Sequence, residues 1–288
     1  MSIVEKAVDK QRRLVKPGSK KDKRLNGIST SETAGISPAT KVDIELDYEE
    51  LAKEGLVPFG HNADRIIDEF RRIKRPLLKA AFGDNDEDSS VSEKSHQALN
   101  LILVASALAS EGKTFTAMNL AMCIALERDR TVVLVDADVA KPHISRMLNV
   151  HNRPGLMDLL QDHSINVGDV LLQTDMPSLK IIPAGKRHRH ASEMLSSQRM
   201  EMIAEELATR YSDRVVLFDS PPILLTSEAQ SLAALMGQLV LVVHAGQTPQ
   251  RAVRDTIELL NHRKVDIVLN KCRSAASSPY YGNYYGHS

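Results

Sequence analysis

The stretch Ala105–Asn119, which reads ASALASEGKTFTAMN, constrains the fold of this chain more than any other. It follows a short apolar run, residues 99–104, that is typical of a buried parallel strand, and residues 116–128 carry apolar side chains at helical spacing. In a loop between a strand and a helix, backbone N–H groups and the positive end of the helix converge on phosphate. The stretch therefore predicts a phosphate-binding loop, in which Lys113 reaches the outer phosphates and Thr114 binds magnesium.

The loop departs from the usual G-x-x-x-x-G-K-[ST] pattern, because Ala107 stands where that pattern has its first glycine. The tripeptide Gly112-Lys113-Thr114 is intact, but such a tripeptide is common by chance. Alone it favours a surface turn at the start of a helix. Support for a nucleotide site therefore has to come from other parts of the chain.

Carboxylates follow two other apolar runs that we expect to be strands. Residues 131–135 precede Asp136 and Asp138, and residues 214–218 precede Asp219. Open parallel sheets place their ligand sites at the carboxyl ends of strands, and buried carboxylates are costly unless a cation or hydrogen bonds stabilise them. A helix cap could explain Asp138 but not readily both Asp136 and Asp138, and Asp219 taken singly could belong to a strand-ending turn. Together with the loop, these motifs predict a site for a nucleotide and magnesium.

Strands and helices alternate through the rest of the chain. We expect strands near residues 99–105, 131–136, 179–183, 214–219, 238–244 and 265–270, and helices near 113–128, 198–211, 227–236 and 249–263. The strands are apolar on both faces, which predicts an α/β fold with a parallel β-sheet flanked by helices on both faces.

Four parts are expected along the chain. Residues 1–61 form a mostly disordered N-terminal arm, rich in Lys, Ser, Thr and Gly, with one short helix at residues 47–55. Residues 62–90 combine a helical segment with an acidic linker, residues 91–273 form the nucleotide-binding domain, and residues 274–288 form a flexible tail.

The second part is dominated by a helix expected at residues 63–82, kinked or divided at Pro76. Glu69, Arg72 and Arg75 follow one another in it at intervals of three residues, near one side. On pattern alone they favour a solvated face, since exposed ion pairs contribute only about 0–1 kcal/mol each. The same ionic groups are available to a neighbouring molecule.

The tail holds four of the six tyrosines of the chain, Tyr280, Tyr281, Tyr284 and Tyr285. Beside Ser, Pro and Gly, such a segment cannot form part of a core and can reach a neighbouring copy. Alone it favours a low-complexity end that stacks on a partner. Combined with a nucleotide site, it predicts a cluster of phosphoacceptors, each gaining about −1.5 to −2 charge on modification.

The bulk composition excludes some function classes. Lys plus Arg equals Asp plus Glu, at 37 each, so charge gives no support for a nucleic-acid partner. The two cysteines are far apart, which fits a reducing cytoplasm, and no stretch resembles a signal peptide or a membrane span, so we expect a soluble protein. The basic stretch at residues 186–190 is interpreted as a solvated loop rather than a metal or phosphate site.

The motif set resembles that of the bacterial tyrosine autokinases associated with polysaccharide export, and most of all their exosortase-associated branch. The likeness covers roughly residues 62–288 and implies a P-loop NTPase fold of the ParA/MinD-like type. It is carried by the segments Gly112–Ala117, Asn119–Ala121, Val135–Pro142, Asp219–Pro222, Thr226–Ala229 and Leu269–Cys272.

The resemblance implies roles for the site residues. Lys113 is catalytic, and Asp136 or Asp138 helps to deprotonate the attacking tyrosine. The implied magnesium ligands are Thr114, Asp136 and Asp219. The implied nucleotide-binding residues are Ser110, Glu111, Gly112, Lys113, Thr114, Phe115 and Asn270, the last at the base. The residues implied to contact a neighbouring subunit are Glu69, Arg72 and Arg75.

The implied function is ATP-dependent phosphorylation of the tail tyrosines in trans within a ring-like homo-oligomer, which regulates exopolysaccharide synthesis or export. The implied partners are a membrane polysaccharide co-polymerase or chain-length protein as activator and an opposing tyrosine phosphatase. The expected location is cytoplasmic, at the inner face of the plasma membrane through that partner.

Two alternatives stay open on the sequence. One is a ParA/MinD-like ATPase switch that controls assembly or positioning without tyrosine phosphorylation, and the other is a nucleotide-binding regulatory module without turnover. The family usually has Pro-Gly in place of Ala109-Ser110, and Arg is common in place of Lys141. We expect nucleotide binding to survive the first change if the backbone angles stay ordinary.

Overall fold

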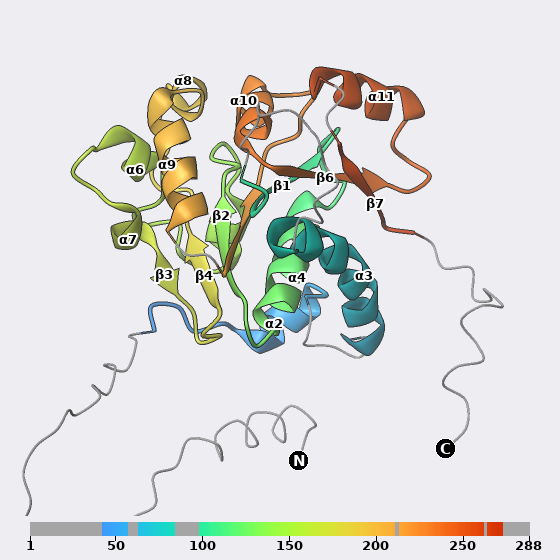
Figure 1. Cartoon of the computed structure of the whole chain (residues 1–288), viewed down its shortest axis with the longest axis horizontal. Helices are drawn as coiled ribbons and strands as arrows, with labels where there is room; N and C mark the ends of the chain where they lie inside the picture. Colours follow the sequence, from blue (N-terminus) through green and yellow to red (C-terminus); the bar gives the residue numbers. More distant parts are fainter. Residues whose placement is uncertain (1–41, 57–62, 84–97, 211–212, 262–263, 273–288) are drawn as a thin grey trace, which may run out of the picture. The chain divides into compact units, whose positions relative to one another are not determined.

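The computed structural model describes residues 42–56, 63–83, 98–210, 213–261 and 264–272 of the chain (Figure 1). Its centre is a seven-stranded sheet with the strand order β3-β4-β2-β5-β1-β6-β7. All neighbours pair in parallel except β3 and β4. The strands are β1 Leu101–Ser106, β2 Thr131–Asp136, β3 Leu172–Gln173, β4 Leu179–Ile182, β5 Arg214–Asp219, β6 Gln238–His244 and β7 Asp266–Asn270.

Ten helices are described along the chain. They are α2 Tyr48–Lys53, α3 Ala63–Phe82, α4 Lys113–Ala125, α5 His143–Met147, α6 Leu156–Gln161, α7 Val167–Val170, α8 Ala191–Leu195, α9 Gln198–Thr209, α10 Ser227–Leu235 and α11 Gln250–Leu259. None of these described helices is both long and apolar enough to cross a lipid bilayer.

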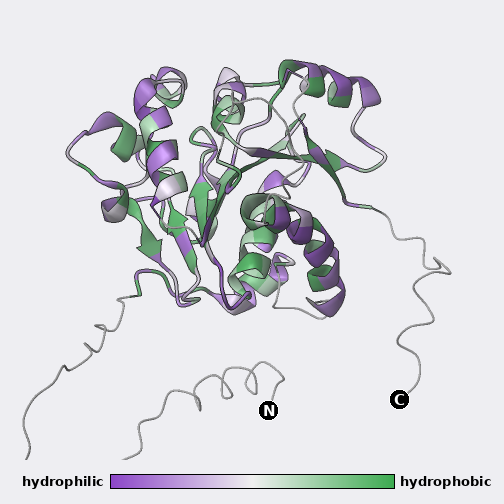
Figure 2. Ribbon diagram, viewed as in Figure 1, coloured by the Kyte–Doolittle hydropathy of each residue, from purple (hydrophilic) through white to green (hydrophobic). Residues whose placement is uncertain are grey.

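Helices cover the sheet on both faces. Because successive side chains of a strand point to opposite faces, Leu101 and Leu103 of β1 join one apolar cluster, with α6 to α10, and Ile102 and Val104 join the other, with α2, α3 and α4. The apolar colouring in Figure 2 follows the central strands and α4, and the outer side of α3 is hydrophilic. The α/β fold expected from the apolar strands is confirmed.

The expected strands and long helices are confirmed within four residues at each end. Of the two outcomes expected at Pro76, division of the long helix is wrong, because α3 runs without interruption from Ala63 to Phe82, and a kink stays a prediction. Pro76 is exposed, and buried Phe70 and Leu77 on either side hold the helix against the rest of the protein. The strand β3 and the short helices α5 to α8 were not expected.

Residues 42–56, which the sequence analysis assigned to the arm, contribute to the packed body. Ile44 is buried and forms a parallel bridge with Thr174, next to β3. The Tyr48 hydroxyl donates a 2.6 Å hydrogen bond to Asp175, and burial, together with this carboxylate, raises the pKa of Tyr48. The rest of the arm, the acidic linker and the tyrosine-rich tail lie outside the described residues.

Candidate nucleotide-binding site

The predicted acidic positions meet at one edge of the sheet. The strands β2, β5 and β1 are consecutive neighbours, and Asp136 at the end of β2 pairs in register with Asp219 at the end of β5. The loop that leaves β1 leads from the same edge into α4. The carboxyl ends of parallel strands are where open α/β sheets bind ligands, so the fold brings all three sequence motifs together.

Gly112 makes the turn from the loop into α4. Its φ of +97° suits glycine alone, and a Cβ atom at this position would overlap the side-chain amide of Asn270. The helix begins without a side-chain cap and with no acid in its first turn. Its first N–H groups and the positive end of its dipole are therefore available to an anion.

The loop lacks two of the usual glycines. Ala107 is fully buried, and Ser110 adopts a left-handed φ of +64°. The condition of ordinary backbone angles is therefore not met at Ser110, and the survival of nucleotide binding stays a prediction. A residue other than glycine pays roughly 1–2 kcal/mol for this conformation, so other contacts have to hold the loop.

Lys113 is buried among carboxylates. Its Nζ lies 2.9 Å from Asp138 Oδ2 and 3.8 Å from Asp219 Oδ1. Burial disfavours the charged lysine, but the charges of Asp219 and Asp138 outweigh this effect and raise its pKa. Lys113 is therefore a fixed cation at the amino end of α4, as a residue that binds phosphate must be.

Thr114 and Asp219 form the second contact of the site. The Thr114 hydroxyl donates a 2.7 Å hydrogen bond to Asp219 Oδ2, and Asp219 Oδ1 has no hydrogen-bond donor in the described structure. Desolvation raises the pKa of this fully buried carboxyl to about 7. A buried carboxylate with an unsatisfied oxygen next to a hydroxyl is a favourable arrangement for a hard cation.

Asp136 is held by a helix that the sequence analysis missed. Its Oδ2 accepts hydrogen bonds from the Ser145 N–H at 2.8 Å and the Ser145 hydroxyl at 2.7 Å, and that hydroxyl accepts one from Ala184 N–H. Desolvation still raises the pKa of Asp136 to about 6. No local pattern pointed to Ser145, because its role arises only when α5 packs beside β2.

The three carboxylates and one lysine fit magnesium bound together with phosphates. Asp136 Oδ1 and Asp219 Oδ1 are buried without hydrogen-bond partners in the described structure. In the described part of the chain, no group of three or more His, Cys, Asp or Glu side chains could hold a metal by itself. Mg²⁺ is usually bound through one or two carboxylates and the phosphates of a substrate, so the donor set suits a magnesium nucleotide.

Glu111 braces the loop from inside. Its buried carboxylate accepts a hydrogen bond from Leu108 N–H at 2.8 Å and another from the Thr248 hydroxyl. The expected nucleotide contact of Glu111 can therefore come from its backbone, because its side chain is already engaged. Thr248, in the turn after β6, was missed because nothing in its local sequence indicates this contact.

Two side chains at the end of β7 donate hydrogen bonds to the phosphate-binding loop. Asn270 Nδ2 donates a 2.9 Å hydrogen bond to the Glu111 carbonyl, and Lys271 Nζ donates a 2.8 Å bond to the Ser110 carbonyl. Asn270 thus lies beside the loop, and its contact with a nucleotide base stays a prediction. Phe115 packs near Phe70 of α3, with 6.4 Å between ring centroids.

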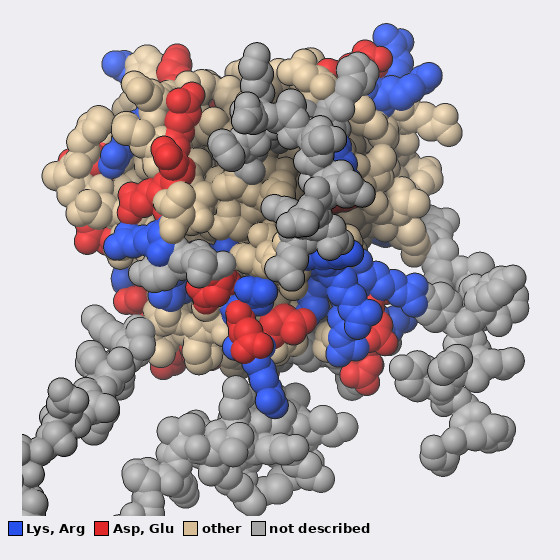
Figure 3. Space-filling view, viewed as in Figure 1, with Lys and Arg blue, Asp and Glu red and all other residues tan. Residues whose placement is uncertain are grey.

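Other predicted residues lie away from this site. Glu69, Arg72 and Arg75 are exposed on α3, where Figure 3 shows Lys and Arg side chains gathered. Glu69 pairs with Arg65 at 3.0 Å. In the basic loop, Arg187 donates a hydrogen bond to the Ala140 carbonyl at 2.5 Å, so this loop lies beside the turn that follows Asp138.

Comparison with known proteins shows which family the chain belongs to. A family model described as an AAA domain matches residues 100–265. Tyrosine-protein kinase YwqD of Bacillus subtilis (strain 168) is 30% identical over 188 residues, covering 64% of this chain and 77% of that protein. The succinoglycan biosynthesis transport protein ExoP of Rhizobium meliloti (strain 1021) is 32% identical over 228 residues, covering 76% of this chain and 28% of ExoP.

The likeness extends to solved structures. The kinase domain of Escherichia coli tyrosine kinase ETK superimposes with a TM-score of 0.56 and 25% identity, over 70% of this chain and 83% of that domain. The chain spans about a third or less of the length of several other curated tyrosine-kinase relatives that it matches. Because the family model covers more than half of the chain and the similarity extends over three quarters of YwqD, the chain belongs to the AAA-domain family of bacterial tyrosine-protein kinases.

Proposed function

We propose that this chain is an ATP- and magnesium-dependent protein-tyrosine kinase that phosphorylates Tyr280, Tyr281, Tyr284 and Tyr285 of a neighbouring copy. The observation that carries the proposal is the buried group formed by Lys113, Asp138 and Asp219 at the amino end of α4. Phosphoryl transfer needs mainly positioning and charge neutralisation, which such a group supplies.

Each residue of the proposed active site has a separate role. Lys113 exchanges its carboxylate partners for the outer phosphates of ATP, and Thr114 with Asp219 and Asp136 would hold the magnesium ion. When bound, the ion would supply positive charge that neutralises the phosphates. Once Lys113 turns to the phosphates, Asp138 loses its 2.9 Å ion pair and is the carboxylate free to accept the proton of the attacking tyrosine.

Mass spectrometry after incubation with Mg-ATP tests the proposal. The wild-type chain, Lys113→Met and a variant with the four tail tyrosines changed to Phe are compared. We expect phosphate on the tail tyrosines of the wild type alone. Mixing Lys113→Met chains, distinguished by isotope labelling, with unlabelled wild type should place phosphate on the labelled tails if transfer occurs in trans.

Two results would overturn the kinase proposal. ATP hydrolysis without phosphotyrosine would favour the ParA/MinD-like ATPase switch. An absence of both activities, also when the activating membrane protein is added, would favour a regulatory module that binds nucleotide without turnover.

The wider setting is also proposed. ExoP is named for the biosynthesis and transport of a polysaccharide, which supports a role for this chain in exopolysaccharide synthesis or export. We propose the exosortase-associated branch, a ring-like homo-oligomer with contacts through Glu69, Arg72 and Arg75, a membrane co-polymerase as activator and an opposing tyrosine phosphatase. Binding through that co-polymerase would place the chain at the inner face of the plasma membrane.

A further inference from the structure

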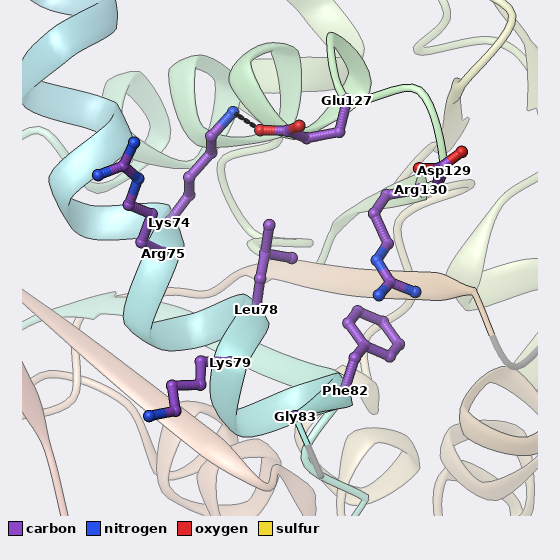
Figure 4. Close-up of a pocket in the computed structure, with 9 residues that line it drawn as sticks. All are labelled: Lys74, Arg75, Leu78, Lys79, Phe82, Gly83, Glu127, Asp129 and Arg130. Atoms are coloured by element: carbon purple, nitrogen blue, oxygen red, sulfur yellow. Dashed lines mark ion pairs between the residues drawn. The ribbon is translucent and has the colours of Figure 1, made fainter.

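A hollow lies away from the nucleotide site, between the carboxyl half of α3 and the turn that joins α4 to β2 (Figure 4). It measures about 380 Å³, which is enough for a phosphorylated aromatic ring. Leu78 and Phe82 face it and form an apolar floor. Arg75, Lys79 and Arg130 also line it. We call this hollow the α3 pocket.

Positive charge at the α3 pocket is not fully neutralised. Of its lining cations, Lys74 is buried and satisfied, because it pairs with Glu127 at 2.5 Å and donates to the Cys123 carbonyl at 2.7 Å. No carboxylate among the described residues lies within ion-pair distance of the other three cations, although Asp129 is also part of the lining. These three cations are therefore available to an anionic ligand.

The apolar floor and the cations of the α3 pocket together favour a ligand that carries a phosphate on an aromatic ring. The Arg130 guanidinium lies over the Phe82 ring, 4.1 Å from its centroid, so its planar fork is already ordered. Arginine binds phosphate through two parallel hydrogen bonds, and the apolar floor offers contact to an aromatic ring. An unmodified tyrosine would bring the ring without the charge, so the pocket would distinguish the two forms.

We propose that the α3 pocket binds a phosphotyrosine of the chain's own C-terminal tail, an inference that rests on the proposed function. Lys271 contacts Ser110 near the amino end of α4, and the pocket lies at the other end of this helix. The 13 residues of α4 span about 20 Å. Tyr280 is eight residues beyond Cys272, a length of up to about 28 Å, so the tail of the same chain can reach the pocket.

Tail phosphate bound in the α3 pocket would weaken the contact between subunits. Arg75 lines the α3 pocket and belongs to the motif proposed to contact a neighbouring subunit. A phosphate that engages Arg75 removes this cation from the subunit contact. Tail phosphate and subunit contact therefore compete for the same side chain.

Fluorescence anisotropy with a synthetic peptide tests the proposal without kinase activity. The labelled peptide covers residues 277–288, either unmodified or with phosphotyrosine at position 284, and the protein is the full chain carrying Lys113→Met. We expect the phosphopeptide to bind at least tenfold more tightly than the unmodified peptide. Adding Lys79→Met or Arg130→Met should each weaken phosphopeptide binding about tenfold, whereas Arg251→Met, a matched loss of an exposed cation on α11, should not.

Several outcomes would overturn the proposal. Equal binding of the two peptides would do so, as would unchanged binding to both pocket variants. Loss of binding when Mg-ADP is added to the wild-type chain, in which Lys113 is present to bind the nucleotide, would assign the peptide to the nucleotide site instead. If inorganic phosphate displaced the phosphopeptide as effectively as phenyl phosphate, the α3 pocket would be an anion site without preference for an aromatic ring. Lys79 is exposed, so its variant keeps the test valid if Arg130→Met does not fold. Because the phosphate is synthetic, an inactive kinase would leave this result unaffected.

Discussion

Lys113 stands among more negative charge than it can neutralise, since Asp136, Asp138 and Asp219 all act on it. Burial raises the pKa of Asp219 to about 7 and that of Asp136 to about 6, from 3.8. The folded chain thus keeps protons that the unfolded chain has lost, so its stability without nucleotide should fall as pH rises from about 4 to about 7.

Asp219→Asn tests this charge imbalance. Without nucleotide, the variant should melt at a higher temperature than wild type at pH 8, and the two should differ less at pH 5, where wild-type Asp219 is protonated. Mg-ATP should stabilise wild type and not the variant, because the variant loses a magnesium ligand. Thermal unfolding at both pH values measures this. A wild type that is the more stable chain at pH 8 would contradict the prediction.

Ser110 is the residue at which the loop is strained. Ser110→Gly should change the free energy of unfolding by less than about 1 kcal/mol, since relief of the left-handed angle is offset by extra freedom of the unfolded chain. Ser110→Val should destabilise the chain and weaken ATP binding, because a branched side chain resists this angle. Denaturant unfolding measures the stability of each variant, and titration with ATP measures its affinity for the nucleotide. Equal behaviour of the two variants would show that the angle is unimportant.

At the scale of elements, the phosphate-binding loop depends on contacts from distant parts of the sheet. Thr248→Val removes the hydroxyl that donates to Glu111 and should raise the Kd for ATP severalfold, with a loss of about 1–2 kcal/mol in stability. The control is Thr209→Val, which removes an exposed hydroxyl bound only to a carbonyl of its own helix. Calorimetric titration with ATP compares the affinities of the two variants. Equal affinities would contradict the proposal that Thr248 stabilises the loop through Glu111.

The elements that could be predicted from sequence were those with a strong pattern. Apolar strands such as β2 and β5 end at their carboxylates, so the edge of the sheet and its acidic residues followed from the sequence. The strand β3 has two residues and the helix α5 has five, too few to show the period of a strand or of a helix. Contacts such as that of Ser145 with Asp136 join separate elements, and no local pattern encodes them.

At the scale of the whole molecule, the segment at residues 42–56 belongs to the packed body. Leu51 and Leu56 are buried with Ile44 in the apolar cluster that contains α4. A chain that begins at residue 42 should keep the melting temperature of the full chain, whereas one that begins at residue 57 should lose several kcal/mol and expose apolar surface. Calorimetry of both chains decides this, and equal stability would contradict the assignment.

The helix α4 has buried residues all round, and after Lys113 its sequence has no charged side chain. Its side chains interlock with their neighbours along the helix, so packing holds it lengthwise as well as laterally. Two contacts near its ends add to this, the turn at Gly112 and the hydrogen bond from Lys74 to the Cys123 carbonyl. The helix is thus a stiff connection between the phosphate-binding loop and the residues that line the α3 pocket, and a displacement at one end would be transmitted to the other.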